Sequence, residues 1–563
     1  MNCIQFLLAS CLLLLPFRSG EAAAPELHQK IDALLTQSDP QFAHHAADLS
    51  RDSTFLRRIH LDLLGRIPTA AEVRTFQQET DSQKRIRAID RLLERPEYAR
   101  HMQHVFDVML MERLPTEKHV SIEKWQDYLY QSFQKNISWQ QLTRDVLSST
   151  GAQAETRGSA RFLLDRELKP ELVTRVIGRV FLGRDLQCAQ CHDHPAIDDY
   201  PQRHYYGLVS FFSRAYLFNN PENKESSIGE KAEGTTKFTS VFTNQEETAV
   251  PRILDLPVIA DPPADKEPYL AKPDKNTRGI PKYSRLQQLP EAITRDENMA
   301  YRQSIANRLW YLMMGRGLVE PLDMFHEGNP PTHPELLKLI ADDLHQHQYD
   351  IRYFLKQLAL TKAYQRSSLD RSNLGHAEEE PEAPRYAAAH MKPLTAEQLA
   401  WSVMQATGLL DITRRATIES FATPKTEAVS PVVTDAISDE VHLETTVNKK
   451  LQEHVAAFVT AFSRVDQPGE FNATANQALF LSNAPLISAW LLPADNNLTA
   501  RLIAETDSDK LAKELYLSVL SRLPSPTEIE QVTRFLGQFS DRTTTVQELV
   551  RALLCSAEFR FNH

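Results

Sequence analysis

The most distinctive chemistry in this sequence of 563 residues comes from two cysteines and a histidine. The segment Cys188-Ala-Gln-Cys191-His192 holds two thiols three positions apart and an imidazole directly after the second thiol. In c-type haem attachment, two thiols add to the vinyl groups of haem and the adjacent histidine ligates the iron, so all three must lie within one turn of the chain. The spacing therefore predicts one covalent haem c on Cys188 and Cys191, with His192 as the ligand of the haem iron.

Three other uses of the same residues remain open. Cys188 and Cys191 could form a redox disulfide, because a thiolate is favoured at the start of a helix. They could also bind zinc or iron together with His192 or His194, or they could be buried structural thiols. A closed zinc site needs four ligands, and the chain holds no second Cys-x-x-Cys pair to complete one. The ligand count therefore favours haem over a structural metal.

Further titratable residues follow this motif closely. His194, Asp198 and Asp199 lie within eight positions of Cys191, where they could orient the ligands of a metal or form a non-haem metal site themselves. His194 is therefore a second candidate metal ligand. We expect His204, slightly further along, to be an ordinary surface histidine.

The beginning of the chain predicts export. An apolar stretch runs from Ile4 to Phe17, and small residues follow at Gly20 and Ala22. This stretch is too short to span a bilayer but has the length of a signal-peptide core, so we expect residues 1–22 to be removed. Because haem attachment takes place outside the cytoplasm, a periplasmic or cell-surface location fits the motif. No later segment is apolar enough for a transmembrane helix.

The overall composition limits which classes of partner are expected. Hydrophobic residues make up 42% of the chain and charged residues 24%, as in ordinary globular proteins, and the formal net charge is -11. No basic stripe is present that would follow a phosphate backbone, so nucleic acid is not an expected partner. A redox protein or another surface protein is the expected partner instead. The sequence contains no hydrolase or nucleotide-binding motif, so neither of these activities has support from motifs, and whether the protein is an enzyme stays open.

The length and the hydrophobic pattern predict two domains. Apolar residues recur at helical spacing in residues 50–215, as at Leu56, Ile59 and Leu63, and again in residues 296–563, where Met313 and Met314 are expected in the core. The segment between them, residues 216–295, holds eight prolines from Pro251 to Pro290. We expect irregular structure and short strands there, including a hairpin near residues 238–242, because helices should not persist among these prolines.

The two ends of the mature chain resemble each other. Residues 55–73 align with residues 511–529 without a gap, and both copies begin a helix with a capping box, Thr69 with Glu72 and Ser525 with Glu528. The shared residues are apolar, capping or turn-forming, so we interpret the repeat as a packing unit. The fold class predicted is mainly α: two helical domains of helix-turn-helix units, joined by a Pro-rich, partly β or irregular segment.

Several of these motifs resemble a known family. The stretches at residues 54–62, 66–69 and 186–195, and those at residues 307–310, 315–319 and 394–397, are similar to the planctomycete cytochrome-like (PSCyt-type) two-domain family of unknown function. The resemblance covers nearly all of the mature chain and implies a cytochrome-like N-terminal domain in residues 50–215, at the surface or in the periplasm. Haem binding in the family is implied by the same Cys-x-x-Cys-His element. In the family, basic residues commonly precede the Leu-Thr-Ala-Glu element, which is residues 394–397 here. This chain has Lys392-Pro393 at that place, which puts a charge-recognition role there in doubt.

Two functions follow from these observations. The first is an exported c-type haem-binding protein with an electron-transfer or redox role. The alternative is a non-enzymatic scaffold or binding protein of the cell surface, in which the cysteine pair is a structural metal site or a disulfide. Only the first predicts that haem stays attached when the protein is denatured.

Overall fold

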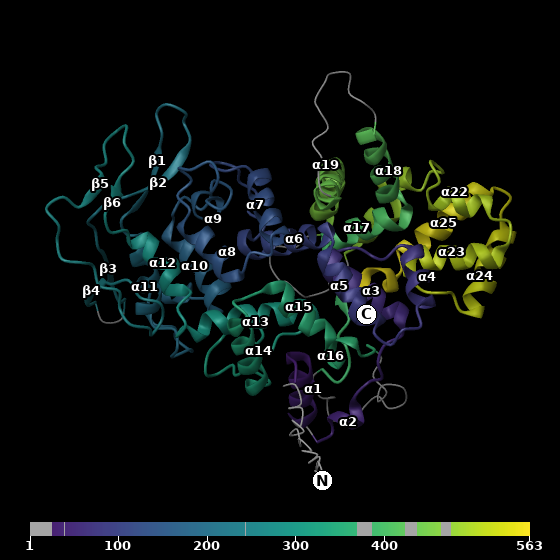
Figure 1. Ribbon diagram of the computed structural model, residues 1–563, viewed down its shortest axis with the longest axis horizontal. Helices are drawn as coiled ribbons and strands as arrows, with labels where there is room; N and C mark the ends of the chain where they lie inside the picture. The colour runs from purple at the N-terminus through teal and green to yellow at the C-terminus, as the bar shows by residue number, and fades with distance from the viewer. Residues whose placement is uncertain (1–24, 39, 242–243, 369–385, 423–435, 463–473) are drawn as a thin grey trace, which may run out of the picture.

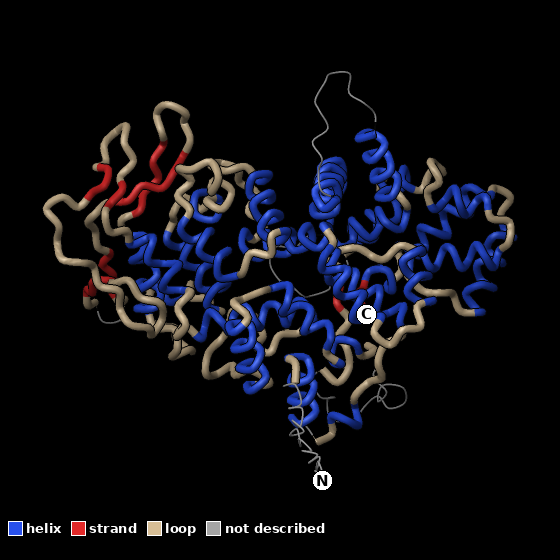
Figure 2. The backbone as a smooth tube through the Cα atoms, in the orientation of Figure 1, coloured by secondary structure: helices blue, strands red, loops and turns tan. Residues whose placement is uncertain are grey.

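The computed structural model confirms a mainly α-helical protein (Figure 1). The structure describes residues 25–38, 40–241, 244–368, 386–422, 436–462 and 474–563. The predicted signal peptide lies outside these residues. Helices fill most of the view, and the strands gather mainly at one end of the long axis (Figure 2). Within the described ranges, none of the helices has both the length and the hydrophobicity needed to cross a bilayer.

The first half of the chain forms a helical body followed by three small hairpins. Its helices are α1 (Leu27–Ser38), α2 (Phe42–His45), α3 (Asp52–Leu64), α4 (Ala70–Gln78), α5 (Lys84–Glu94), α6 (Pro96–Met111), α7 (Ile122–Gln134), α8 (Trp139–Ser148), α9 (Arg161–Leu164), α10 (Pro170–Leu182), the short 3-10 helix η1 (Cys188–Gln190) and α11 (Gln202–Phe212). The antiparallel strand pairs are β1 (Ala215–Asn219) with β2 (Ser226–Glu230), β3 (Thr236–Thr239) with β4 (Glu246–Ala249), and β5 (Tyr269–Ala271) with β6 (Ile280–Pro281). In the second pair Phe238 lies opposite Glu247, which confirms the hairpin predicted around residue 238.

One expectation for the Pro-rich segment is wrong. Helix α12 (Arg285–Ile293) contains Pro290 in its interior, although we expected no helix to persist there. Proline removes one backbone hydrogen bond from a helix, at a cost of about 3 kcal/mol or more. The helix persists because Leu286, Leu289 and Ile293 are buried in the core, and Ser284 caps its first turn by accepting the backbone N–H of Gln287.

In the second half of the chain, the described residues form helices, one strand pair and connecting loops. Its elements are α13 (Met299–Met314), α14 (Pro334–Gln346), α15 (Ile351–Leu360), α16 (Lys362–Gln365), β7 (Lys392–Pro393), α17 (Ala396–Thr407), α18 (Leu409–Ala422), α19 (Ala436–Phe462), α20 (Ala475–Asn483), α21 (Pro485–Trp490), α22 (Leu498–Ala504), α23 (Ser508–Leu520), α24 (Pro526–Gln538), α25 (Arg542–Leu554), α26 (Ala557–Arg560) and β8 (Phe561–Asn562). Strand β8 pairs with β7, which brings the end of the chain back beside α3 (Figure 1). Met313 and Met314 are buried in the core, as predicted.

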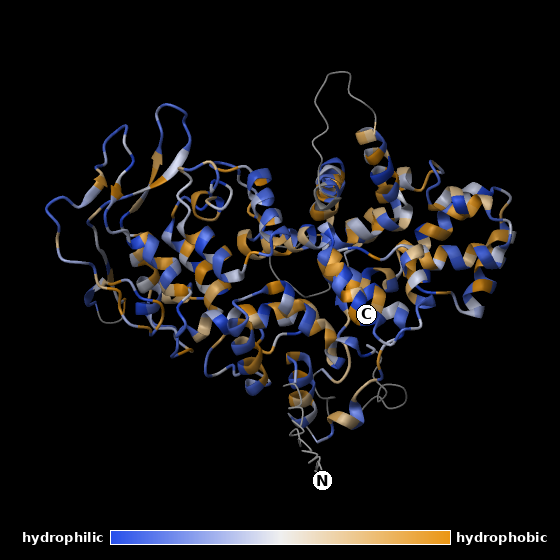
Figure 3. Cartoon of the chain, viewed as in Figure 1, coloured by the Kyte–Doolittle hydropathy of each residue, from blue (hydrophilic) through white to orange (hydrophobic). Residues whose placement is uncertain are grey.

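The described residues form two hydrophobic cores that share helices α3 and α23, since Leu517 of α23 packs in the first core and Leu515 in the second. Most of the helices carry both hydrophilic and hydrophobic residues, as amphipathic helices do (Figure 3). The first core joins the N-terminal helices to α13–α16, which follow the predicted boundary at residue 296. The second core joins α17–α26. Helix α3 lies between them, because Ile59 packs in the first core and Leu61 in the second.

The repeat predicted from the sequence is present in the structure. Helix α3 leads into α4 and α23 leads into α24, and each first helix ends at a residue in the left-handed conformation. Thr69 and Ser525 both form complete capping boxes, so that each hydroxyl accepts a backbone N–H and each partner glutamate accepts another. The matching geometry agrees with the interpretation of the repeat as a packing unit.

Candidate functional site

The cysteine motif lies on a surface loop between α10 and α11. Helix α10 ends at Leu182, and Gly183 follows it in the left-handed conformation with φ +65°, where a side chain would collide with the ring of Phe325. The loop then turns through η1. Leu186 and Ala189 are fully buried and fasten this turn to the core, whereas Cys188 and Cys191 are exposed free thiols. Cys188 is the first residue of η1, and Cys191 directly follows its last residue, so the two exposed thiols stand at the two ends of one short turn.

His192 directly follows the second thiol and is partly exposed. Its Nδ1 lies 2.6 Å from the backbone carbonyl oxygen of Asp193. A carbonyl oxygen can only accept, so the proton of the neutral ring belongs on Nδ1 and the lone pair on Nε2. The carboxylate of Asp193 accepts the backbone N–H of Gln202 at 2.6 Å, which ties this turn to the start of α11. The local hydrogen bonds therefore select the tautomer in which Nε2 can ligate a metal.

The other candidate ligands have separate contacts. The Nδ1 of His194 accepts the backbone N–H of Ala196 at 3.2 Å. The carboxylate of Asp199 accepts the backbone N–H of Glu327 at 2.8 Å, and Asp198 is exposed. Across the described ranges, no group of three His, Cys, Asp or Glu side chains lies close enough to hold a metal ion.

The expectation that His204 lies on the surface is wrong. Only 1% of His204 is exposed, and its Nε2 lies 2.9 Å from a carboxylate oxygen of Asp255. Burial lowers the pKa of His204, and the Asp255 carboxylate opposes this change. Asp255 lies in the Pro-rich segment, more than 50 positions away, so the sequence pattern around His204 gave no sign of this partner.

Residues from the second half of the chain hold the cysteine loop in place by hydrogen bonds. The backbone of Asp185 donates to the Asp323 carbonyl at 2.9 Å, and that of Phe325 donates to the Gly183 carbonyl at 3.1 Å. The hydroxyl of Tyr200 donates to the Phe325 carbonyl at 3.2 Å. These bonds join the cysteine loop to residues 323–325, which belong to the predicted C-terminal domain, and so fix its position.

Aromatic side chains lie beside the second thiol. The hydroxyl of Tyr206 donates to the Gln190 carbonyl at 3.1 Å. The ring of Tyr206 stacks on that of Phe238, with centroids 4.4 Å apart and an angle of 7° between the planes. Burial raises the pKa of Tyr206, and its interaction with the nearby Cys191 adds to the change. The loop therefore presents two thiols, an imidazole and a partly exposed aromatic pair together.

The protein is thus mainly helical and carries a Cys-x-x-Cys-His turn at its surface. Residues 30–216 match the family PSCyt2, described as a protein of unknown function (DUF1549). Residues 285–536 match PSD1, likewise described as a protein of unknown function (DUF1553). The chain therefore belongs to the two-domain PSCyt-type family. No curated protein and no solved structure shows a significant similarity to it.

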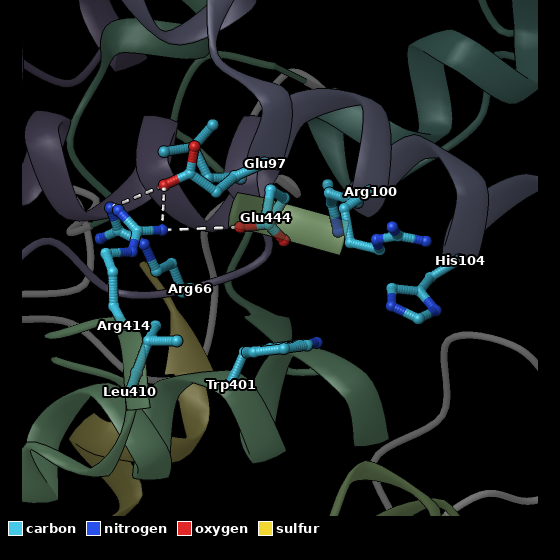
Figure 4. A pocket seen from close by; sticks show the side chains of 10 residues that line it. Arg66, Glu97, Arg100, His104, Trp401, Leu410, Arg414 and Glu444 are labelled. Carbon is cyan, nitrogen blue, oxygen red and sulfur yellow. Dashed lines mark hydrogen bonds and ion pairs between the residues drawn. The ribbon is translucent and has the colours of Figure 1, made fainter. Parts of the chain in front are cut away.

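Sequence reasoning missed a buried cluster of charges in the middle of the molecule. Figure 4 shows Glu97 from α6 and Glu444 from α19, which both contact Arg414 from α18. The only sign in the sequence is the alignment of Glu97-Tyr98 with Glu558-Phe559 in the repeat, which marks Glu97 as part of the packing unit. Nothing near residue 444 indicates that it faces Glu97.

Proposed function

We propose that the protein is an exported c-type haem-binding protein with an electron-transfer or redox role. One observation carries this proposal: Cys188 and Cys191 are both exposed, one at the start of a short turn and one directly after it, and His192 follows the second thiol. Covalent attachment needs two accessible sulfurs and an adjacent imidazole. A haem-maturation pathway operates outside the cytoplasm, so the proposal includes export by the N-terminal signal.

The residues present fit a haem group. Cys188 and Cys191 would hold it by two thioether bonds, and His192 would ligate the iron through Nε2. The hydrogen bond between His192 Nδ1 and the Asp193 carbonyl supports this role, because metal-ligating histidines usually donate their other ring proton to an oxygen acceptor. Bound haem would supply a one-electron iron couple.

The chain's own residues would then set the surroundings of the group. The stacked rings of Tyr206 and Phe238 offer an apolar surface beside Cys191. Residues 323–325 hold the loop in place through backbone hydrogen bonds, so that little reorganisation accompanies a change of charge. A rigid and partly exposed site of this kind suits the transfer of electrons to another protein.

A set of variants tests the proposal. The protein is secreted in a host with a working haem-maturation pathway, and covalent haem is detected by haem staining after denaturing electrophoresis. We expect staining in the wild type, loss of staining when Cys188 and Cys191 are both changed to Ala, and unchanged staining in Cys555→Ala, which removes an exposed cysteine outside the motif.

The histidine has a different expected effect. His192→Ala should leave part of the covalent attachment and change the spin state and potential of the iron, because only the axial ligand is lost. Wild-type protein that contains zinc or a Cys188–Cys191 disulfide and no haem would contradict the proposal. The surface scaffold would then be the better description.

A further inference from the structure

A pair of buried carboxyl groups joins the two hydrophobic cores. Glu97 is 8% exposed and Glu444 is 5% exposed. Both contact the same nitrogen of the Arg414 guanidinium, at 3.0 Å for Glu97 and 3.5 Å for Glu444 (Figure 4). Two carboxylates that share one cation in a buried site repel each other, so the second charge is unfavourable.

The two carboxyl groups have unequal support. Glu97 also pairs with Arg95 at 2.5 Å and with Arg66 at 3.7 Å. Burial raises the pKa of Glu97, but the guanidinium groups of Arg95, Arg66 and Arg414 outweigh this and lower it to about 2. For Glu444, burial and then the charge of Glu97 raise the pKa to about 7. Glu97 is therefore the ionised member of the pair, and Glu444 is the member that holds a proton.

Charged, polar and apolar side chains surround the pair. A cavity of about 20 Å³ lies beside the two carboxyl groups, which is room for about one water molecule. The Nε2 atoms of His101 and His104, which help to line it, have no hydrogen-bond partner within the described part of the chain. The titratable groups that face Glu444 from the neighbouring elements are Arg66 after α3, Glu97, Arg100, His101 and His104 on α6, Tyr130 on α7 and Arg414 on α18.

We propose that Glu97 and Glu444 bind one proton between them, and that loss of this proton to solvent loosens α19 from α6. The O–H bond of the Glu444 carboxyl group breaks, the proton goes to water, and two carboxylates then face each other across Arg414. The contact between the two cores would thereby depend on pH. This inference does not rest on the haem proposal.

The repeat provides a comparison within the same chain. Arg522, Glu528 and Glu558 form the same arrangement as Arg66, Glu72 and Glu97, with Arg522 donating to both glutamates. Glu558 is part of this triad but is more exposed, at 30% of its side chain, against 11% for Glu97. The second copy therefore has the same ion pairs in a more solvated setting, and Glu558 is the matched control position.

The sign of the pH effect follows from which state binds the proton. Between its ordinary pKa of 4.5 and about 7, Glu444 holds a proton in the folded protein but not in the unfolded one. Its contribution to stability is thus fully present at low pH and is lost as pH rises toward 7. Glu97 has the opposite effect, since its lowered pKa of about 2 adds stability above 4.5 that is lost as pH falls toward 2.

Amide hydrogen exchange of the full secreted protein tests the proposal. Exchange in α19 is compared between wild type and Glu444→Gln at the same pH, so that the intrinsic pH dependence of exchange cancels. We expect the ratio of wild-type to variant exchange to rise by up to about tenfold for each pH unit between 4.5 and 7 and to level off above pH 7, because only in this range do the closed and opened states differ in protonation of Glu444. A ratio that does not change across this range overturns the proposal.

A control variant and an infrared measurement complete the test. Glu558→Gln should not change the exchange of α19 at any pH, and a change equal to that of Glu444→Gln would overturn the proposal. The infrared carbonyl band of a protonated carboxyl group should be present in the wild type at mildly acidic pH and disappear by mildly alkaline pH. Absence of such a band in the wild type at mildly acidic pH would overturn the proposal even if Glu444→Gln does not fold.

Discussion

Replacing Asp62 with Asn should be among the most destabilising changes that leave the cysteine loop untouched. Asp62 lies on α3, is 2% exposed, and accepts three hydrogen bonds from distant parts of the chain. Lys392 Nζ donates at 2.6 Å, the Tyr364 hydroxyl at 2.8 Å and Asn562 Nδ2 at 2.8 Å. These bonds link α3 to α16, β7 and β8, so one carboxylate holds the centre of the molecule together.

The cost follows from what Asp62→Asn leaves behind. Lys392 would keep its bonds to the carbonyls of Leu312 and Met313, at 2.9 and 3.0 Å, but would lose its opposite charge. Burial already lowers the pKa of Lys392, and the Asp62 carboxylate opposes this change. Removing one partner of a buried ion pair costs about 3–5 kcal/mol, because the other charge stays buried without compensation.

Thermal unfolding followed by circular dichroism measures this effect. Asp62→Asn should unfold at a clearly lower temperature than the wild type, and the double variant Asp62→Leu, Lys392→Met should recover much of the loss, since it removes both charges. Lys338→Met is the control, because it breaks an exposed ion pair with Asp342 and should not change the midpoint measurably. A loss below about 1 kcal/mol for Asp62→Asn, or a double variant less stable than either single one, would refute the reasoning.

Other predictions concern the repeat and the buried histidines. Thr69→Ala and Ser525→Ala should each cost about 1 kcal/mol in denaturant unfolding, because each removes a complete capping box; a cost in only one copy would show that the two units do not pack alike. His104 should make the protein less stable as pH falls below 6.5, since burial lowers its pKa to about 4 and the folded state therefore binds the proton later than the unfolded state; His104→Gln should flatten the stability profile between these pH values, and an unchanged slope would contradict this. Tyr206→Ala should expose the haem to solvent and shift its Soret band without reducing covalent attachment, whereas loss of attachment would show that the ring is needed for maturation.

Much of the fold could be predicted from the sequence, because local patterns decide it. Thr69 with Glu72 and Ser525 with Glu528 are capping boxes that need only four adjacent residues. The helical spacing of Leu56, Ile59 and Leu63 likewise predicts a buried helix from one segment. Pro290 is the clear failure, because burial of the apolar face of α12 outweighs the lost backbone hydrogen bond.

The central helix shows why the rest could not be predicted. Helix α3 carries Arg57, Arg58, His60 and Asp62, all buried, although charged residues usually mark the solvent face of a helix. Arg57, Arg58 and Asp62 find partners in distant parts of the chain: Arg57 donates to the Phe559 carbonyl at 2.9 Å, for example, across 502 positions. Only the tertiary structure identifies such partners.

The same holds for the functional residues: local motifs could be predicted from the sequence, and pairs of distant residues could not. The pattern of Cys188, Cys191 and His192 is local, so the sequence alone could single it out. The pairs His204 with Asp255 and Glu97 with Glu444 join segments that no periodicity relates, and burial rather than sequence spacing gives them their properties. A sequence can therefore locate an attachment motif more readily than a buried pair of carboxyl groups.

The mass of the intact, denatured protein tests the central proposal most directly. The protein is secreted through a working haem-maturation pathway, unfolded, and measured together with its absorption spectrum. The proposal predicts a mass increase of one haem that persists after unfolding, located by digestion to the peptide with Cys188, Cys191 and His192, and a Soret band in the same species. A mature chain with the mass of the polypeptide alone, or one lighter by two hydrogens because of a Cys188–Cys191 disulfide, would contradict it.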